Sequence, residues 1–121
     1  MVFPTINTKA SNITITPQLQ SLLEQKFAPL GKLLDERKQV LCEIELEKVT
    51  DQHSGKIFRA EVNLTSGGKL FRAEATEEQI EQAIDIVRNE IKHELQHAHG
   101  KRKSLLKRGH QAIKDMMRRG K

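Results

Sequence analysis

The chain has 121 residues, of which 31% are charged and 36% are hydrophobic, so it fits one small domain with a modest core. Its single cysteine, Cys42, excludes an internal disulfide, and no apolar run approaches the roughly 20 residues that a membrane helix needs. The N-terminus lacks a basic segment followed by an apolar one, so we expect no secretory signal and a cytoplasmic protein.

The formal net charge of +5 is unevenly distributed along the chain. Residues 1–100 carry 12 Lys and Arg against 15 Asp and Glu, whereas residues 101–121 carry nine Lys and Arg against a single acid, Asp115. A basic tail on a mildly acidic body indicates a polyanionic partner. Nucleic acid is the commonest such partner and an anionic membrane surface is the rival, while a solvated flexible tail without a partner is a third interpretation.

The N-terminal third of the chain predicts a strand and a helix. Residues 2–10 are rich in β-forming side chains, and Thr16 followed by Pro17 is typical of a helix start. We expect a kink or break after Ala28, because Pro29 lacks an N–H group and clashes with the preceding turn. Apolar side chains recur through this region at helical spacing, at Leu19, Leu22, Leu23, Phe27, Leu30 and Leu34.

Three strands are predicted next. Residues 40–49 and 57–65 alternate between apolar and polar side chains, and Gly67-Gly68 predicts a hairpin to a last strand at 69–75. The solvent face of this sheet then carries mainly carboxylates, at Glu43, Glu45, Glu47, Glu61 and Glu74, diluted by Arg59 and Arg72. That face lacks the aromatic side chains on which RNA bases stack, so we expect RNA to meet the helices and the tail instead.

A second helix completes the predicted domain. Thr76 and Gln79 fit a capping box at its start, and Gly100 weakens the helical pattern at its end. One apolar stripe runs along it, at Ile80, Ile84, Val87, Ile91 and Leu95. The order β-α-β-β-β-α predicts an α+β fold in which two helices pack on one face of a four-stranded sheet, followed by the basic C-terminal tail. We expect residues 1–100 to form the domain and residues 101–121 to be flexible or to extend as a helix.

The residues 93–97, HELQH, fit the H-E-x-x-H pattern of zinc metalloenzymes. A helical wheel places His93 and His97 opposite the apolar stripe, and the third ligand position of the longer pattern is Lys103, which cannot bind zinc as a cation. We therefore expect a non-catalytic protein without cofactors, although a weak surface metal site that includes His99 and His110 stays open. Cys42 lies at an inward strand position and is interpreted as a core residue.

Four short blocks resemble the ribosome hibernation-promoting factor and ribosome-associated inhibitor family, and they occur in the family's order. They are NITITP at 12–17, LEKVT at 46–50, GKLFRAE at 68–74 and QAID at 82–85. At its length the chain is similar to the short form of the family. The resemblance implies a factor that binds the small ribosomal subunit and its ribosomal RNA, in the channel for messenger and transfer RNA, and silences idle ribosomes in starved or resting cells.

The mechanism that this resemblance implies is occupancy of the channel, without catalysis or a small-molecule substrate. The expected RNA-binding residues lie on the helices and the tail: Lys26, Lys32, Arg88, Lys92, His93, His97, Lys101, Arg102, Lys103, Lys107 and Arg108. The chain departs from the family at Glu90, His93 and His97, where the family's second helix carries cations. We expect a monomer off the ribosome and no membrane partner. A generic RNA-binding regulatory adaptor with a basic tail is the alternative, and an H-E-x-x-H zinc enzyme is a further one.

Overall fold

The computed structural model describes the backbone of residues 2–119 and the side chains of residues 2–100. Its elements follow the predicted order β-α-β-β-β-α, with one 3₁₀ helix added after the first α-helix. They are β1 (Ile6–Ser11), α1 (Pro17–Phe27), η1 (Ala28–Leu33), β2 (Val40–Lys48), β3 (Phe58–Ser66), β4 (Lys69–Glu77) and α2 (Ile80–Arg119).

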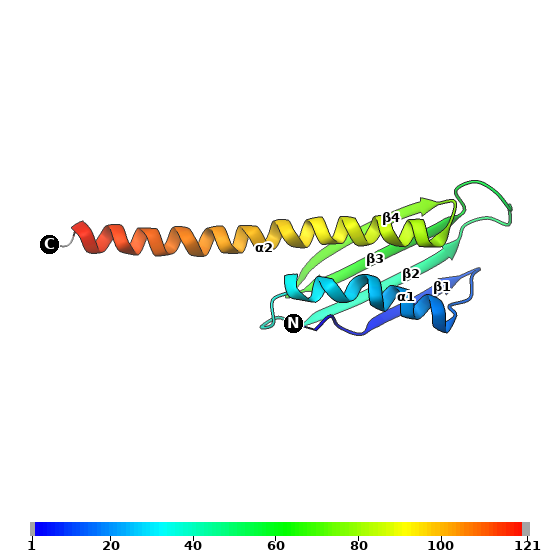
Figure 1. Ribbon diagram of the computed structural model, residues 1–121, viewed down its shortest axis with the longest axis horizontal. Coiled ribbons are helices and arrows are strands. Elements are labelled where there is room, and N and C mark those ends of the chain that lie inside the picture. Colours follow the sequence, from blue (N-terminus) through cyan, green and yellow to red (C-terminus); the bar gives the residue numbers. More distant parts are fainter. Residues whose placement is uncertain (1, 120–121) are drawn as a thin grey trace.

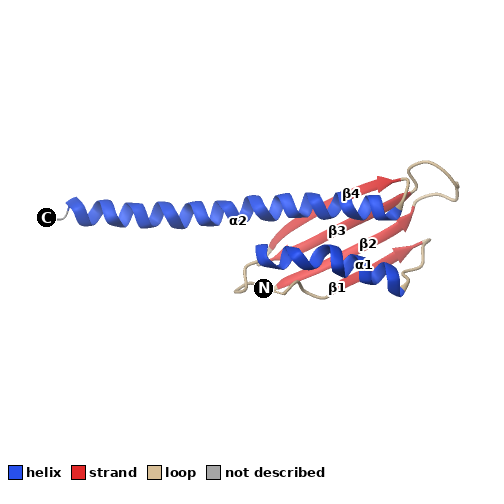
Figure 2. Cartoon of the chain, in the orientation of Figure 1, coloured by secondary structure: helices blue, strands red, loops and turns tan. Residues whose placement is uncertain are grey.

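The four strands form one sheet in the order β1-β2-β3-β4. β1 pairs with β2 in parallel, and the other two pairings are antiparallel. Figures 1 and 2 show α1 and α2 side by side on the same face of this sheet, while its other face stays open. The predicted α+β fold with two helices on one face is therefore confirmed.

The core lies between the sheet and the helices, and the strand alternation fills it as predicted. The side chains with the least exposure come from every layer: Leu23, Phe27, Leu30, Cys42, Ile44, Leu46, Ala60, Val62, Leu64, Ala83, Ile84, Val87 and Ile91. Burial raises the pKa of the Cys42 thiol to about 12, with a smaller contribution from the neighbouring Glu43. Cys42 is therefore a neutral core side chain rather than a reactive thiolate.

The start and the break of the first helix are both confirmed. Thr16 caps α1, because its Oγ1 accepts a hydrogen bond from the Leu19 N–H at 3.1 Å, and Pro17 takes the first helical position. α1 ends at Phe27, and the chain tightens into η1 from Ala28 onward. A 3₁₀ helix over this segment accommodates Pro29, which has no N–H group to donate.

Three predicted boundaries are wrong. β1 begins at Ile6 rather than at Val2. Thr76 is not the cap of α2, because β4 continues to Glu77, and α2 begins only at Ile80. Strand pairing explains the difference: Thr76 and Glu77 continue the ladder with Arg59 and Phe58 of β3, which satisfies backbone groups that a helix start would leave open.

The second helix is much longer than the sheet. α2 runs from Ile80 to Arg119, passes through Gly100 and projects beyond the sheet, as Figure 1 shows. Its predicted apolar stripe packs on β3 and β4 as far as Leu95, which is 3% exposed. Across the described residues, no helix contains a segment long and apolar enough to cross a membrane.

Candidate nucleic-acid interface

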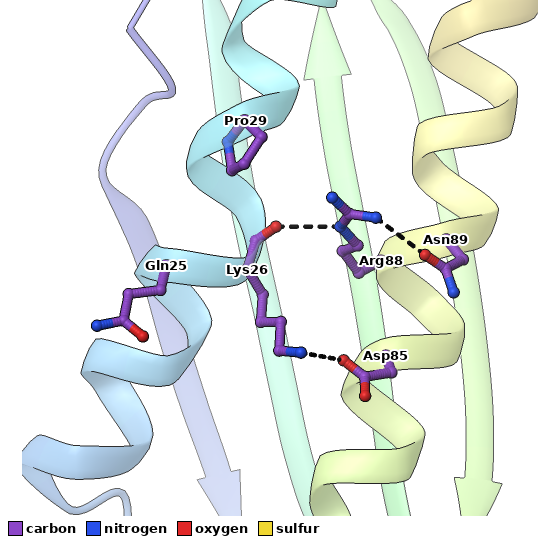
Figure 3. Close-up of a pocket in the computed structure, with 6 residues that line it drawn as sticks. All are labelled: Gln25, Lys26, Pro29, Asp85, Arg88 and Asn89. Carbon is purple, nitrogen blue, oxygen red and sulfur yellow. Dashed lines mark hydrogen bonds and ion pairs between the residues drawn. The ribbon is translucent and has the colours of Figure 1, made fainter.

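Two of the expected RNA-binding residues, Lys26 of α1 and Arg88 of α2, lie together where the helices meet. The Lys26 ammonium forms an ion pair with Asp85 at 2.9 Å, which connects α1 to the first turns of α2 (Figure 3). Both side chains are about half exposed, so the pair contributes little to stability, about 0.5 kcal/mol. Its main effect is to direct a cation of α1 toward α2.

Arg88 makes the second connection between the helices, and it does so through the backbone. Its Nε donates a hydrogen bond to the Lys26 carbonyl at 3.1 Å, and its Nη1 donates to Asn89 Oδ1 at 3.0 Å. The Lys26 carbonyl lies in the last turn of α1, where helix carbonyls commonly accept hydrogen bonds from side chains. The guanidinium thus adds a side-chain donor to a carbonyl in the last turn of α1 and places a positive charge at the negative end of the α1 dipole.

A polar pocket of about 390 Å³ lies at this junction. Figure 3 shows its lining, which is Gln25, Lys26, Pro29, Asp85, Arg88 and Asn89. Arginine has five N–H donors, and the two hydrogen bonds of Arg88 leave others for a ligand. Because amide, ammonium and guanidinium groups all donate hydrogen bonds to phosphate oxygens, the pocket has the chemistry for a backbone contact with RNA.

The other expected helix residues spread from this junction. Lys92 lies one turn after Arg88 and is half-buried, whereas His93 and His97 are exposed, as the helical wheel predicted. Lys32 lies on η1 and is exposed. The structure therefore brings Lys26, Arg88 and Lys92 to one side of α2, and the two histidines lie on its outward face.

The expected tail residues belong to the part of α2 beyond Gly100. Their side chains lie outside those that the structure describes, so their roles stay predictions: Lys101, Arg102, Lys103, Lys107 and Arg108. Their backbone positions follow directly from the domain along one helix.

The H-E-x-x-H residues do not gather a third ligand among the described side chains. His93, Glu94 and His97 are all exposed on α2, and within residues 2–100 no three His, Cys, Asp or Glu side chains are arranged to hold a metal ion. A catalytic zinc site needs three protein ligands and a shielded cavity. The motif is therefore a poor basis for an enzyme mechanism. His110 lies outside the described side chains, so the predicted weak surface site that includes it is untested.

The open face of the sheet holds an ion-pair network centred on Arg59. Its Nε donates to Glu74 at 2.8 Å, its Nη1 donates to Glu47 at 3.1 Å, and its Nη2 donates to Glu61. Glu45 lies 3.5 Å from the same guanidinium. Hydrogen bonding to Glu74 and the surrounding carboxylates raise the pKa of Arg59 above its ordinary value, against a smaller opposing effect of burial.

Glu61 is the least exposed carboxylate of this network. Burial opposes its ionisation, but the hydrogen bond from Asn63 and the charges of Arg59 and Arg72 outweigh that effect, so the pKa of Glu61 lies below its ordinary value. Glu61 therefore stays ionised, and the open face keeps more carboxylates than cations. This charge balance agrees with the expectation that RNA phosphate meets the helices rather than this face.

Sequence reasoning missed two features of the surface. One is Asp85, whose pairing with Lys26 joins two elements far apart in the chain. The other is a groove of about 770 Å³ at the end of the sheet, where Arg37 and Lys38 face the β3–β4 hairpin. The adjacent basic pair immediately before a strand was the signal for this groove, but its chain neighbours Asp35 and Glu36 obscured it in a count of charge.

Residues 6–103 match the family described as "Sigma 54 modulation protein / S30EA ribosomal protein". Among solved structures, the N-terminal domain of Protein Y from Thermus thermophilus superposes with a TM-score of 0.65 at 21% identity, covering 78% of this chain and 98% of that one. A ribosomal subunit interface protein from Coxiella burnetii gives a TM-score of 0.60 at 16% identity, covering 78% of this chain and 97% of that one. A comparison with curated sequences gives no match.

The fold and the match along most of the chain define a ribosome-associated factor. The chain belongs to the Sigma 54 modulation protein / S30EA ribosomal protein family, and its resemblance to the ribosome hibernation-promoting factors is confirmed. At their low identities, the two solved structures add support for the fold alone.

Proposed function

We propose that this protein binds the small ribosomal subunit in the channel for messenger and transfer RNA, and thereby silences idle ribosomes in the cytoplasm. The family match over residues 6–103 is the observation that carries this proposal. One of the structural neighbours is described as a ribosomal subunit interface protein, which agrees with a site between subunits. The protein acts as a monomer that occupies the channel, so no catalytic residue is required.

The charge distribution indicates which side of the domain faces the RNA. The α1–α2 junction offers Lys26, Arg88 and Lys92, whereas the open face carries the carboxylates around Arg59. Lysine and arginine contacts with phosphates position a protein on RNA without reading its sequence. The helix side of the domain therefore faces ribosomal RNA, and the tail residues from Lys101 onward add further contacts along α2.

Sedimentation through a sucrose gradient tests ribosome binding directly. At about 50 mM salt the protein should sediment with small subunits and whole ribosomes, and at about 500 mM salt it should remain at the top, because phosphate contacts weaken steeply with salt. Protein that remains at the top at low salt would overturn the proposal. Binding to an unrelated structured RNA as tightly as to small subunits would instead favour the generic RNA-binding adaptor.

The channel is tested by competition on purified small subunits. Subunits that already hold messenger RNA and a P-site transfer RNA should bind the protein at least about tenfold more weakly than empty subunits, since the ligands occupy one space. Equal binding to empty and filled subunits would place the protein elsewhere on the subunit. The Lys26→Glu and Arg88→Glu variants should lose affinity for empty subunits, which assigns the α1–α2 junction to the contact.

A further inference from the structure

A second candidate contact lies at the end of the sheet where the β3–β4 hairpin turns. A groove of about 770 Å³ opens there between the hairpin and the loop that precedes β2. It is lined by Arg37, Lys38, Gln39, Val40, Leu41, Thr65, Gly67 and Gly68. Its volume falls within the roughly 300–1,000 Å³ of ordinary ligand sites. The groove lies apart from the α1–α2 junction, because the two share no lining residue.

Strand register places the groove at the end of the sheet. The pairing of β1 with β2 begins at Ile6 and Cys42, so the first two residues of β2 have no strand beside them on that side. The hairpin is joined to the loop by one backbone hydrogen bond, from the Gly67 N–H to the Gln39 carbonyl at 3.0 Å. Gly67 and Gly68 both have positive φ angles, which the two-residue turn requires and which suit glycine.

The rim of the groove is cationic. The aliphatic stem of Lys38 lies against Gly67, so closely that a Cβ built on that glycine would be 2.5 Å from Lys38 Cδ. Packing of the stem leaves the ammonium at the rim, as is usual for a lysine on a surface. Arg37 is 88% exposed and is oriented by Asp35, which its Nε contacts at 3.3 Å. Asp35 and Glu36 precede this pair in the loop but do not line the groove.

The floor of the groove is apolar and continues across the open face. Leu41, Thr65 and Leu70 are register neighbours on three adjacent strands. Leu41 is 47% exposed and Leu70 is 56% exposed, and they are two of the four large hydrophobic side chains on the described surface. The carboxylates of the open face begin one row further on, at Glu43. Cations beside an uncharged apolar row suit a ligand with both phosphates and flat bases.

We propose that this hairpin-end groove binds a single-stranded segment of RNA. The phosphates contact Lys38 and Arg37, a base lies on Leu41 or beneath the Arg37 guanidinium, and the Gln39 amide and the Thr65 hydroxyl are placed to bond base edges. α2 leaves the domain at this same end of the sheet (Figure 1), so its basic part after Gly100 extends from the end of the sheet where the groove lies. Both can therefore follow one polyanion.

This inference rests on the proposed function, because the ribosome is taken as the source of the RNA. The experiment is chosen so that failure of the groove and failure of ribosome binding give different results. The Arg37→Glu/Lys38→Glu double variant reverses both rim charges, and Lys9→Glu/Lys56→Glu is the matched control. All four residues are exposed, and the control residues lie on β1 and in the β2–β3 loop, away from the groove. Both variants make the same change in net charge, so any difference between them reports position.

Affinity is measured for small subunits and for a single-stranded RNA of about ten nucleotides, a length that spans one such site. The groove variant should bind both at least about fivefold more weakly than the control, and its log–log salt slope should be shallower by about 1.5, as for two lost phosphate contacts. Equal affinity of the two variants for both ligands would overturn the proposal that the groove binds RNA. Wild-type protein that binds the oligonucleotide but not the ribosome would overturn the proposed function and leave the groove standing.

Ultraviolet crosslinking identifies the occupant. Ribosome-bound protein should yield RNA conjugates on peptides that contain residues 37–41 or 65–70. Crosslinks from these peptides to an acidic segment of a protein, with no RNA conjugate there, would contradict the proposal and make the groove a protein-binding site.

Discussion

An arginine with carboxylates nearby lies on each side of the molecule, Arg88 on the helix side and Arg59 on the open face of the sheet. Arg88 joins two helices, whereas Arg59 joins three strands of the sheet. On the open face, Arg59 forms ion pairs with four carboxylates from β2, β3 and β4, so its positive charge is balanced within the sheet. At the α1–α2 junction, the Nε of Arg88 donates a hydrogen bond to a backbone carbonyl of α1, and Arg88 makes no ion pair among the described residues. The charge of Arg88 is therefore not balanced by a carboxylate among the described residues and remains for a ligand, whereas that of Arg59 is balanced within a stabilising network.

The largest expected effect comes from removing the basic part of α2. Deletion of residues 101–121 should weaken small-subunit binding on the order of 100-fold at physiological salt and flatten its salt dependence, because several phosphate contacts are lost together. Equilibrium binding at a series of salt concentrations measures both quantities. The core contacts of α2 reach Leu95, so the shortened domain should keep its fold, which circular dichroism checks. An unchanged salt slope would show that the tail makes no contact with RNA.

On the open face, Arg59→Ala should lower stability without changing ribosome binding. Without the guanidinium, Glu61 loses one of the partners that offset its burial and three further carboxylates lose their shared cation, so the free energy of unfolding should fall by about 2 kcal/mol. Urea denaturation measures the loss, and ribosome affinity should stay unchanged. Arg72→Ala is the matched control, because that side chain is 56% exposed and its loss should cost about 0.5 kcal/mol. Equal costs for the two variants would contradict the central role of Arg59.

The pH dependence of stability follows from the same network. The pKa of Glu61 is lowered in the folded protein, so its ionised form stabilises the fold above the unfolded-state pKa, and this stability is lost as pH falls through the folded-state value. Arg59→Ala removes one cause of the lowered pKa. Its acid unfolding midpoint should therefore move to higher pH than that of the wild type. An unshifted midpoint would mean that Asn63 and Arg72 alone hold Glu61 ionised.

Arg88→Ala should affect both stability and binding. The Lys26 carbonyl loses its side-chain donor, which should cost about 1 kcal/mol in the free energy of unfolding, and affinity for small subunits should fall by about tenfold. Arg88→Lys is the informative control, since it retains the charge but cannot form the same two hydrogen bonds. Full affinity of Arg88→Ala would remove the junction from the RNA contact and limit Arg88 to joining the helices.

The smallest expected effect concerns the two exposed histidines of α2. If His93 and His97 face phosphate, binding to small subunits should tighten about two- to fivefold as pH falls from about 7.5 to about 6, because a protonated imidazole adds a positive charge to the contact. The His93→Gln/His97→Gln variant should lose this pH dependence. Persistence of the dependence in that variant would assign it to other histidines or to the ribosome.

The elements themselves were predictable because their signals are local. Alternation at 40–49 and 57–65 follows from the two-residue repeat of a strand, and the stripe from Ile80 to Leu95 follows from the helical repeat. The cap at Thr16 depends on residues within one turn of the chain. The failure at Thr76 is equally informative. Its sequence fits a helix cap, but pairing with Arg59 of the neighbouring strand favours the β conformation. A local sequence pattern does not show this pairing, because Arg59 lies 17 residues earlier in the chain.

The sequence by itself determined the fold class and the two charged regions of the chain, because periodicity and composition carry that information, and its four short blocks pointed to the family by resemblance. Only the tertiary structure decided how the charges are used. Strand register brings the carboxylates of three strands to Arg59, and helix packing brings Arg88 to a carbonyl 62 residues away. Register likewise pairs the start of β2 with the end of β3, which brings Arg37 and Lys38 beside the hairpin glycines and forms the groove. These contacts join residues distant in the chain, so their geometry exists only once the sheet and helices have packed.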